Sequence, residues 1–490
     1  MEIRNPATGE VIGQVEVAAP ADISNAASRA RNAQFRWKDA PFSSRARVLR
    51  RFHDLILDRR ELILDTIQAE TGKARRDALA EIISVAGTAR YYLANGAEHL
   101  HAKRRQPAVL AVTSAEVTYK PHGVVGLITP WNYPFLLAIA DALPALLAGN
   151  AVILKPSELT PLSANLARDF LVQSELDPAL LIVVHGGAEV GRELIQYVDY
   201  VGFTGSVATG RQVAVAASER LIPFSLELGG KNPMVVLEGA SLDDAASGLV
   251  VGAFSNSGQT CISIERAYVQ ETIYEDFARR LVEKTSALKL GWSKSWDIDM
   301  GSLINADHAK KVLSRIQRAV DEGAHVVAGG RLRTDLGPSF VDPTVLTNVA
   351  DDMPISTEET FGPVVALYPV RSVEEAVARA NNSEFGLNAS VWAGDQAQAR
   401  AVARQLETGS VGVNSTLLIY NSFDVPMGGV KRSGIGRRHG EHGILRYTQA
   451  QSIVSSVAMG GGYDATLMRV KNERVVRALS ALLKLWRRLA

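Results

Sequence analysis

The spacing of hydrophobic positions divides the chain into a helical start and a long alternation of short strands and helices. From about residue 20 to 105, apolar residues recur three and four positions apart, which predicts amphipathic helices. Short, continuously apolar segments then alternate with helical ones; the predicted strands are 123–130, 151–157, 180–187 and 198–205. Apolar strands separated by helices are typical of a parallel sheet covered on both faces.

The same alternation returns after residue 231 and predicts a second α/β domain, with helices at 241–255, 272–288, 373–381 and 395–407. A chain of 490 residues is too long for one ordinary domain. We place the boundary at Gly229–Gly230, because two glycines permit a sharp turn. At 108–122 the pattern is extended and rich in β-formers.

Charge and cysteine content exclude several classes of protein. The 53 Lys and Arg residues nearly balance the 52 Asp and Glu residues, so nothing in the charge indicates binding to nucleic acid. The single cysteine, Cys261, excludes an internal disulfide and a cysteine-rich zinc site, and we predict no metal. The first residues lack the pattern of a secretory signal, and no run of about 18 apolar residues occurs. A cytoplasmic location is the default expectation.

Two segments carry reactive side chains. Cys261 lies in NSGQTCISIE (256–265), and on its own a free cysteine is more often a small buried hydrophobe than a nucleophile. Glu227 lies in SLELGGKNP (225–233), where a predicted strand runs into two glycines. A glutamate at a strand end is often only solvated, but in a cleft it can act as a general base with a raised pKa.

Three further segments favour a nucleotide-binding site next to this chemistry. Asn132, in ITPWNYP (128–134), can donate from its amide to an oxyanion, or it can simply shape a turn between prolines. The glycine-rich segment 203–211 leads from a strand into a helix, where backbone N–H groups can hold a diphosphate, although it lacks the G-x-G-x-x-G pattern. Lys155 and Glu158 end another strand, and each alone is consistent with a surface charge.

Together and in this order, the five segments resemble the aldehyde dehydrogenase superfamily from about residue 4 to 457, and most closely its bacterial succinate-semialdehyde dehydrogenase-type members. The most specific motifs are PWNYP, FTGS, LELGGKNP, GQTC and EETFGPV (358–364), supported by NPATGE (5–10) and GRRHG. The resemblance implies an α/β fold with three parts and a homodimer or homotetramer. These parts are a dinucleotide-binding domain (1–107 and 123–230), a catalytic domain (231–425) and a β oligomerisation arm (108–122 and 449–458).

The resemblance also implies a role for each matching residue. Cys261 becomes the nucleophile, Glu227 the base, and Asn132 the oxyanion donor together with the backbone N–H of Cys261. The implied cofactor-binding residues are Thr129, Trp131, Lys155, Ser157, Glu158, Gly205, Ser206, Gly210, Leu228, Glu359 and Phe361. The implied reaction is NAD(P)-dependent oxidation of an aldehyde to a carboxylic acid. It passes through a thiohemiacetal and a thioester on Cys261, and water activated by Glu227 hydrolyses the thioester.

Single positions bear on the cofactor and on the base. A carboxylate at Glu158 can accept hydrogen bonds from ribose hydroxyls and would repel a 2′-phosphate, which favours NAD over NADP. Ser157 and Lys155 can still tolerate a phosphate, so use of both cofactors is expected. In 434–440 some relatives carry a second acid where this chain has Arg438. Glu227 is therefore expected to act as the base alone.

The substrate stays open between two classes. The resemblance points to succinate semialdehyde, whose carboxylate should meet an arginine. The better-understood semialdehyde enzymes have arginines where this chain has Ser255 and Ala140. A pocket for apolar or aromatic aldehydes is equally compatible. An enzyme that passes the acyl group to coenzyme A and a non-catalytic binding protein are less favoured, because Cys261, Glu227 and Asn132 are all present.

The chain ends in a basic segment beyond the part that resembles the family. Residues 466–490 are predicted to form an amphipathic helix, with an apolar stripe of Val475, Leu479, Leu482, Leu483 and Trp486. Packing against the body or a neighbouring subunit is the favoured interpretation. Attachment to an anionic membrane surface is the alternative, since basic helices with tryptophan bind such surfaces.

Overall fold

The computed structural model describes residues 1–107 and 113–456, together with 470, 472–474, 476–478, 480, 481 and 484. The chain forms two compact units. The first is Met1–His99 with Pro121–Thr448, and the second is Leu100–Lys120 with Gln449–Ala490. In the described part of the chain, no helix is both long and apolar enough to cross a membrane.

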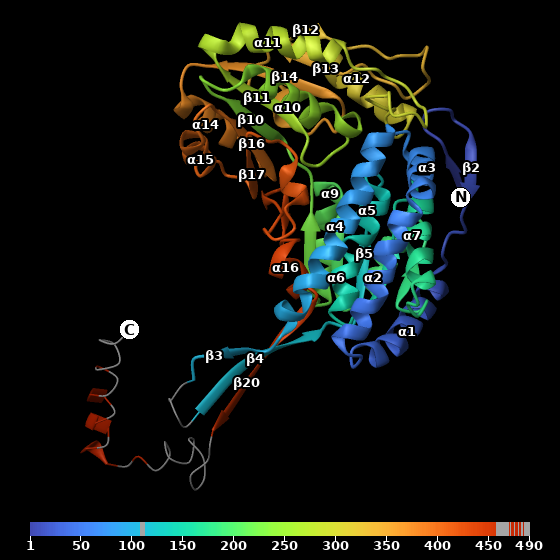
Figure 1. Ribbon diagram of the computed structural model, residues 1–490, viewed down its shortest axis with the longest axis vertical. Helices are drawn as coiled ribbons and strands as arrows, with labels where there is room; N and C mark the ends of the chain where they lie inside the picture. Colours follow the sequence, from blue (N-terminus) through green and yellow to red (C-terminus); the bar gives the residue numbers. More distant parts are fainter. Residues whose placement is uncertain are drawn as a thin grey trace. The chain divides into compact units, whose positions relative to one another are not determined.

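The first unit begins with a β-hairpin and four helices (Figure 1). These are β1 (Glu2–Arg4), β2 (Val11–Gln14), α1 (Pro20–Trp37), α2 (Phe42–Asp58), α3 (Arg60–Thr71) and α4 (Arg75–Leu100). Helix α1 begins at a proline, and the Asp22 carboxylate accepts the backbone N–H of Ala19 at 2.9 Å. Its buried alanines, Ala26, Ala30 and Ala33, share one face at the predicted spacing and let the helix pack closely on the sheet behind it.

A six-stranded sheet follows, in the order β19-β9-β8-β5-β6-β7. Its strands are β5 (Val124–Ile128), β6 (Ala151–Lys155), β7 (Leu181–Val183), β8 (Tyr200–Thr204), β9 (Phe224–Glu227) and β19 (Gly434–Ile435). Five strands are parallel, as predicted, but β19 pairs antiparallel with β9, and Gly434 lies opposite Glu227. A strand of two residues is too short to produce a hydrophobic pattern, so the sequence did not predict it.

Helices cover both faces of this sheet (Figure 1). They are α5 (Pro134–Ile139), α6 (Ala142–Leu147), α7 (Pro161–Gln173), α8 (Ala188–Ile195) and α9 (Val207–Glu219). Helices α1 and α8 contact each other and pack on the central strands, and α9 packs on β8 and β9. The carboxyl ends of the parallel strands are thereby left at one edge, next to the start of α8 and α9.

The second sheet has seven strands in the order β12-β13-β14-β11-β10-β16-β17. Its strands are β10 (Asn232–Val236), β11 (Ile264–Gln270), β12 (His325–Ala328), β13 (Thr344–Thr347), β14 (Val364–Val370), β16 (Asn388–Trp392) and β17 (Ser410–Val413). Only the edge strand β12 is antiparallel to its neighbour. Successive side chains of β10 enter two different cores: Val235 one, Met234 and Val236 the other.

Those two cores are filled by helices on opposite faces of the second sheet. The helices are α10 (Leu242–Phe254), α11 (Glu271–Ser286), α12 (Ala306–Asp321), α13 (Pro354–Thr357), α14 (Val373–Asn381) and α15 (Gln396–Ala403). Helices α10 and α11 fill one core, and α12, α14 and α15 fill the other. The unit also contains the strand pair β15 (Phe385–Gly386) and β18 (Val430–Lys431), and α16 (Gly440–Leu445). The predicted α/β class with two sheet domains is confirmed.

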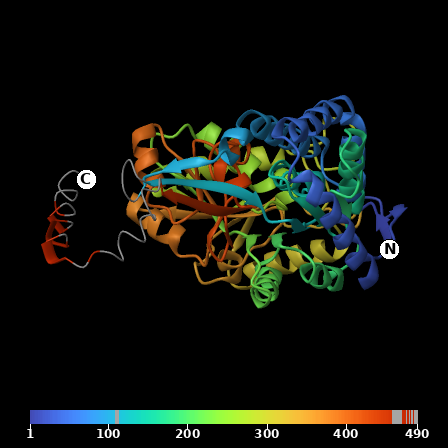
Figure 2. The same ribbon diagram turned by 90° about the horizontal axis from the view of Figure 1, so that it is seen from below.

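The second unit contains a three-stranded sheet in the order β20-β4-β3, seen as two blue strands and one red strand in Figure 2. Its strands are β3 (Lys103–Arg105), β4 (Thr113–Pro121) and β20 (Thr448–Ser456). Of the predicted arm, residues 108–112 and 457–458 lie outside the described residues. The described residues from 473 to 484 are helical, but the predicted apolar stripe lies outside them, so both interpretations of this tail stay predictions.

Candidate active site

A sharp reversal of the backbone presents Cys261. After α10 ends, Asn256, Ser257 and Gly258 take left-handed conformations in succession, with φ of 50°, 56° and 71°. A Cβ on Gly258 would lie 2.1 Å from the carbonyl oxygen of Gly362, so no larger residue fits there. The chain then passes through Cys261 into the buried strand β11. This segment holds the cysteine at a fixed place between a helix and a strand.

Buried hydrogen bonds tie Asn132 to the cysteine segment. The Asn132 side-chain amide donates to the carbonyl oxygen of Gln259 at 3.0 Å. The Asn256 amide donates to the carbonyl oxygens of Asn132 at 2.9 Å and Gln259 at 3.1 Å. The buried Lys73 ammonium donates to the same Asn132 carbonyl at 2.7 Å. The structure therefore fixes this amide beside a backbone position two residues before Cys261.

Asn132 and Cys261 line one cavity of about 110 Å³. Its other lining residues are Ala80, Ser84, Tyr133, Leu136, Leu137, Thr260, Ile262, Leu417, Tyr420 and Asn421. No Asp, Glu, Lys or Arg side chain is among these lining residues. The described residues that line this cavity are thus mostly apolar or carry hydroxyl and amide groups, and none is a Lys or Arg.

The environment of Cys261 favours the neutral thiol. Cys261 is partly exposed at the cavity wall. Burial of the sulfur raises the pKa of Cys261 to about 12; Arg438 opposes this rise, and the carboxylates Glu227 and Glu359 add to it. The thiol is therefore protonated at neutral pH in this structure and needs help to lose its proton before it can act as a nucleophile.

Glu227 ends strand β9 next to two buried arginines. Its Oε1 lies 3.7 Å from Arg438 Nε and 3.8 Å from Arg446 Nη1, and it is buried without a hydrogen-bond partner. Burial raises the pKa of Glu227, while the two arginines lower it. Glu227 is not among the residues that line the cavity of Cys261. The arginine pair at this carboxylate was not predicted as part of the site.

A larger cleft of about 350 Å³ lies at the carboxyl ends of β5, β6 and β8. Seven of the predicted cofactor-binding residues line it: Thr129, Trp131, Lys155, Ser157, Glu158, Gly205 and Ser206. Ser206 caps α9 by accepting the backbone N–H of Thr209 at 3.3 Å. Arg192 on α8 and Gln212 on α9 also line the cleft. These two residues were not predicted from the sequence, because each lies in an ordinary helical pattern.

Two charged residues of this cleft differ in exposure. The Lys155 ammonium is buried and donates to the carbonyl oxygens of Pro156 at 2.8 Å and Gly186 at 2.7 Å. Burial lowers the pKa of Lys155. The Glu158 side chain is 50% exposed, and its Oε2 lies 3.8 Å from Lys155 Nζ. Glu158 therefore offers a free carboxylate edge to a ligand, whereas Lys155 already has two acceptors.

Four of the predicted cofactor-binding residues, Gly210, Leu228, Glu359 and Phe361, are not among the cleft-lining residues. A Cβ on Gly210 would lie 2.6 Å from Leu228 Cδ2, so the absence of a side chain there lets α9 pack against the residue after Glu227. Leu228 is itself buried. Gly210 and Leu228 therefore contribute to the packing of helix α9 against the end of strand β9. Their predicted contact with a cofactor stays a prediction.

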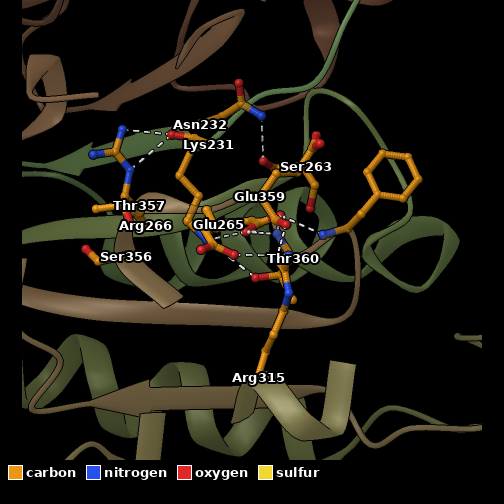
Figure 3. A network of polar contacts seen from close by, with 12 residues as sticks. Lys231, Asn232, Ser263, Glu265, Arg266, Arg315, Ser356, Thr357, Glu359 and Thr360 are labelled. Carbon is orange, nitrogen blue, oxygen red and sulfur yellow. Dashed lines mark hydrogen bonds and ion pairs between the residues drawn. The ribbon is translucent and has the colours of Figure 1, made fainter. Parts of the chain in front are cut away.

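Figure 3 shows the buried ionic network around Glu359 and Thr360, and the backbone N–H of Phe361 also donates to this network. The Glu265 carboxylate accepts the backbone N–H groups of Thr360 and Phe361 at 2.9–3.0 Å and pairs with the Lys231 ammonium. Burial raises the pKa of Glu359 to about 7, and its carboxylate accepts the backbone N–H of Gly230 at 2.9 Å. This network was not predicted; the charged residues Glu265 and Arg266 within the otherwise mostly apolar strand β11 are the sequence signal that could have indicated it.

Aromatic contacts bring the two sheets together at the cleft. The rings of Trp131 and Phe361 lie edge to face, with centroids 5.5 Å apart. Trp131 follows the first sheet's strand β5, and Phe361 precedes the second sheet's strand β14. His308 on α12 contacts the same pair, and its Nε2 lies 2.8 Å from the Phe361 carbonyl oxygen. The predicted residue Phe361 of the second sheet is thus in contact with Trp131, which lines the cleft.

Comparisons with known proteins agree with this geometry. Residues 1–453 match the model of the aldehyde dehydrogenase family. A protein of Mycolicibacterium smegmatis named "Putative succinate-semialdehyde dehydrogenase", with NADP(+) in its name, is 44% identical over 481 residues, which cover 97% of this chain and 93% of that protein. The 4,4'-diapolycopene aldehyde oxidase of a Methylomonas species is 38% identical over 448 residues, covering 91% of this chain and 83% of that one.

Solved structures show the same fold. The crystal structure of an aldehyde dehydrogenase of Mycobacterium tuberculosis complexed with NAD+ has a TM-score of 0.89 and 34% sequence identity, covering 94% of this chain and 95% of that one. The structure of PutA from Anabaena variabilis has a TM-score of 0.90 and 37% identity, covering 94% and 99%. Family model, curated relatives and solved structures lead to one conclusion: this chain belongs to the aldehyde dehydrogenase family, whose members oxidise small-molecule aldehydes.

Proposed function

We propose that this protein oxidises an aldehyde to a carboxylic acid with Cys261 as nucleophile, Asn132 as oxyanion donor and Glu227 as base. The observation that carries the proposal is that Cys261 and Asn132 share the wall of one apolar cavity. The Asn132 amide is anchored two residues before the sulfur. An amide aimed at a developing oxyanion lowers a barrier by about 3–4 kcal/mol where one donor has been removed in other enzymes.

The chemistry balances with these three residues. The thiol of Cys261 releases its proton to solvent as the sulfur adds to the carbonyl carbon, and the negative charge that forms on the carbonyl oxygen is stabilised by Asn132 and the backbone N–H of Cys261. The residues that line the larger cleft would hold NAD or NADP, which would supply the acceptor for the hydride removed from this carbon, so that a thioester would remain on Cys261. Glu227 then takes a proton from water, the water oxygen attacks the thioester, and the acid leaves as the thiol is restored.

The cleft at the carboxyl ends of β5, β6 and β8 fits a dinucleotide. It joins strand ends to the capped start of α9 and holds both cations and a carboxylate. We infer that NAD is preferred and NADP is also used, because Glu158 offers its exposed carboxylate to ribose hydroxyls while Arg192 and Lys155 line the same cleft. The name of the mycobacterial relative supports NADP use, and the solved complex supports NAD use.

Glu158→Ser is expected to move cofactor preference toward NADP by about tenfold or more, since one like charge beside a phosphate is removed. The ratio of kcat/KM for NAD to that for NADP measures this change. Glu219→Ser, at the exposed far end of α9, is the matched control and should leave the ratio unchanged. An unchanged ratio in Glu158→Ser, or a wild-type enzyme that prefers NADP, contradicts the assignment.

For the substrate, we propose an apolar or aromatic aldehyde. No Lys or Arg is among the described residues that line the cavity of Cys261, so a distal carboxylate of the substrate would lie there without a cationic partner. Succinate semialdehyde is the second candidate, favoured by the name of the mycobacterial relative. Transfer of the acyl group to coenzyme A is a weaker alternative, because Glu227 is available to activate water.

We expect kcat/KM for hexanal or benzaldehyde to equal or exceed that for succinate semialdehyde in an assay of NADH formation with and without coenzyme A. A 100-fold preference for the semialdehyde contradicts the apolar assignment, and a requirement for coenzyme A contradicts hydrolysis. The variant Asn421→Arg introduces a cation at the exposed rim of the cavity and so tests the same assignment in the opposite direction. It should raise the relative rate with the semialdehyde by about tenfold, because it gives the carboxylate a cation.

We also infer that the protein forms a homodimer or homotetramer through the three-stranded sheet. Strand β20 is an edge strand of that sheet. Ile453 and Val454 on it are exposed, with Val454 at 66%. An exposed edge strand with apolar side chains is a ready surface for pairing with another chain. This supports the oligomer that the sequence resemblance implies.

A further inference from the structure

Arg438 occupies a buried position between β19 and α16, and its own backbone holds it there. Its N–H donates to the Met427 carbonyl oxygen at 2.7 Å, and the Met427 N–H donates to the Arg438 carbonyl at 2.8 Å. The guanidinium Nη2 donates to Asp141 Oδ2 at 2.8 Å and to Thr204 Oγ1 at 3.2 Å. With one end of the guanidinium fixed in this way, the Nε is directed at Glu227 Oε1, 3.7 Å away.

Glu227 belongs to a cluster of four buried charged residues, with Asp141, Arg438 and Arg446. The two carboxylates balance the two guanidinium groups in charge, but the four side chains differ in the hydrogen bonds that they make. Asp141 accepts both Arg438 at 2.8 Å and Arg446 at 2.5 Å, so its carboxylate is well satisfied. Arg446 also donates to the Tyr447 hydroxyl at 2.7 Å. Glu227 Oε1 and Arg438 Nε both lack a hydrogen-bond partner, although each is buried. The Oε1 atom of Glu227 is thus positioned by the charges of the two arginines and not by a hydrogen bond.

We propose that Arg438 is a positioning residue that holds the Glu227 carboxylate as an anion in place for activating water. The inference rests on the proposed role of Glu227 as the base. It goes beyond the sequence analysis, in which Glu227 was expected to act as the base alone because Arg438 stands where some relatives carry an acid. In this chain the position holds the opposite charge, and it faces the base directly.

Other charged or titratable groups also act on Glu227, so the effect of Arg438 must be separated from theirs. Those groups are Asp141, Tyr200, Cys261, Tyr420, Arg437 and Arg446. Apart from burial, Arg438 is the strongest influence on the pKa of Glu227 and lowers it. Removal of this cation should therefore raise the pKa of Glu227. As the pH is lowered, the carboxylate of the variant then becomes protonated, and inactive as a base, at a higher pH than in the wild type.

The experiment uses the full-length protein with NAD and benzaldehyde in a rapid-mixing instrument. Arg438→Gln keeps a donor for Asp141 but removes the charge. It should retain the initial burst of NADH, which reports thioester formation, while the steady-state rate falls about 10–100-fold. The acidic limb of the steady-state rate should move to higher pH by about one unit. Arg438→Lys, which restores the charge, should recover the wild-type limb and most of the rate.

Controls separate positioning from structure. Arg333→Met removes an arginine that pairs with Asp335 and Asp342 away from both cavities, and it should behave as wild type. The proposal is overturned if Arg438→Gln keeps the wild-type pH limb, or if Arg438→Gln and Arg438→Lys have the same steady-state rate and pH limb. It is also overturned if Arg438→Gln loses the initial burst of NADH together with the steady-state rate. If Glu227→Gln itself leaves the steady-state rate unchanged, the proposed base is wrong. If Glu227→Gln lowers the steady-state rate but the Arg438 variants keep the wild-type rate and pH limb, Glu227 remains the proposed base and the inference about Arg438 fails.

Discussion

Cys261→Ala is expected to lower kcat for aldehyde oxidation by about 10³-fold or more, because no other thiol is present to form the covalent intermediate. The reason is structural as well as chemical. The backbone reversal through Asn256 and Gly258 places this one sulfur at the wall of the apolar cavity. NADH formation with benzaldehyde, measured in steady state and in the first turnover, tests the expectation.

Binding of cofactor provides the control for this variant. Cys261 is not among the residues that line the larger cleft, so the affinity for NAD should stay within about twofold of wild type. Thermal unfolding should change little, because the sulfur is only partly buried and alanine removes a single atom. Substantial oxidation by Cys261→Ala contradicts covalent catalysis, whereas loss of both NAD binding and activity would indicate a general structural defect.

Glu227→Gln is expected to separate the two halves of the reaction. The first turnover should still release NADH, because thioester formation needs the sulfur and the oxyanion donor. The steady-state rate should fall by about 10²–10⁴-fold, since water is no longer activated. The amide is nearly the same size as the carboxylate, so the packing beside Arg438 and Arg446 is retained. Glu219→Gln at the exposed end of α9 serves as the matched control.

The pH dependence of the wild-type enzyme follows from the same residue. Burial raises the pKa of Glu227. A base works only when deprotonated, so the steady-state rate should fall as the pH decreases through this raised pKa, above the usual range of a glutamate. Glu227→Gln should lose that limb. An unchanged limb in the variant, or a variant with a wild-type steady-state rate, contradicts the assignment of this base.

The alternation of predicted strands and helices gave most of the fold, because apolar segments and helical spacing can be recognised within a few neighbouring residues of the sequence. Helix α14 has the predicted bounds, and strands β5, β6 and β8 lie within predicted segments. The antiparallel edge strand β19 could not be predicted, since two residues carry no period and their pairing with β9 joins positions about two hundred residues apart. Helix α12 lay in a stretch that the sequence analysis did not interpret, although its apolar residues recur at helical spacing.

The candidate site divides in a similar way. Cys261, Asn132 and most cofactor-cleft residues lie in motifs that end strands or open helices, so the sequence order pointed to them. The surroundings of Glu227 did not. Its contact with Arg438 depends on two chain segments meeting across the sheet edge, and no local pattern in 434–440 shows which carboxylate the arginine faces. The cavity's lack of cations likewise required the assembled structure.

Intact and peptide mass spectrometry of Glu227→Gln, quenched after mixing with NAD and benzaldehyde, tests the covalent role of Cys261 most directly. We predict that the peptide containing Cys261 gains the mass of the aldehyde less two hydrogens, in step with the first NADH released. NADH formation without any added mass on that peptide, or an adduct on another residue, contradicts the account.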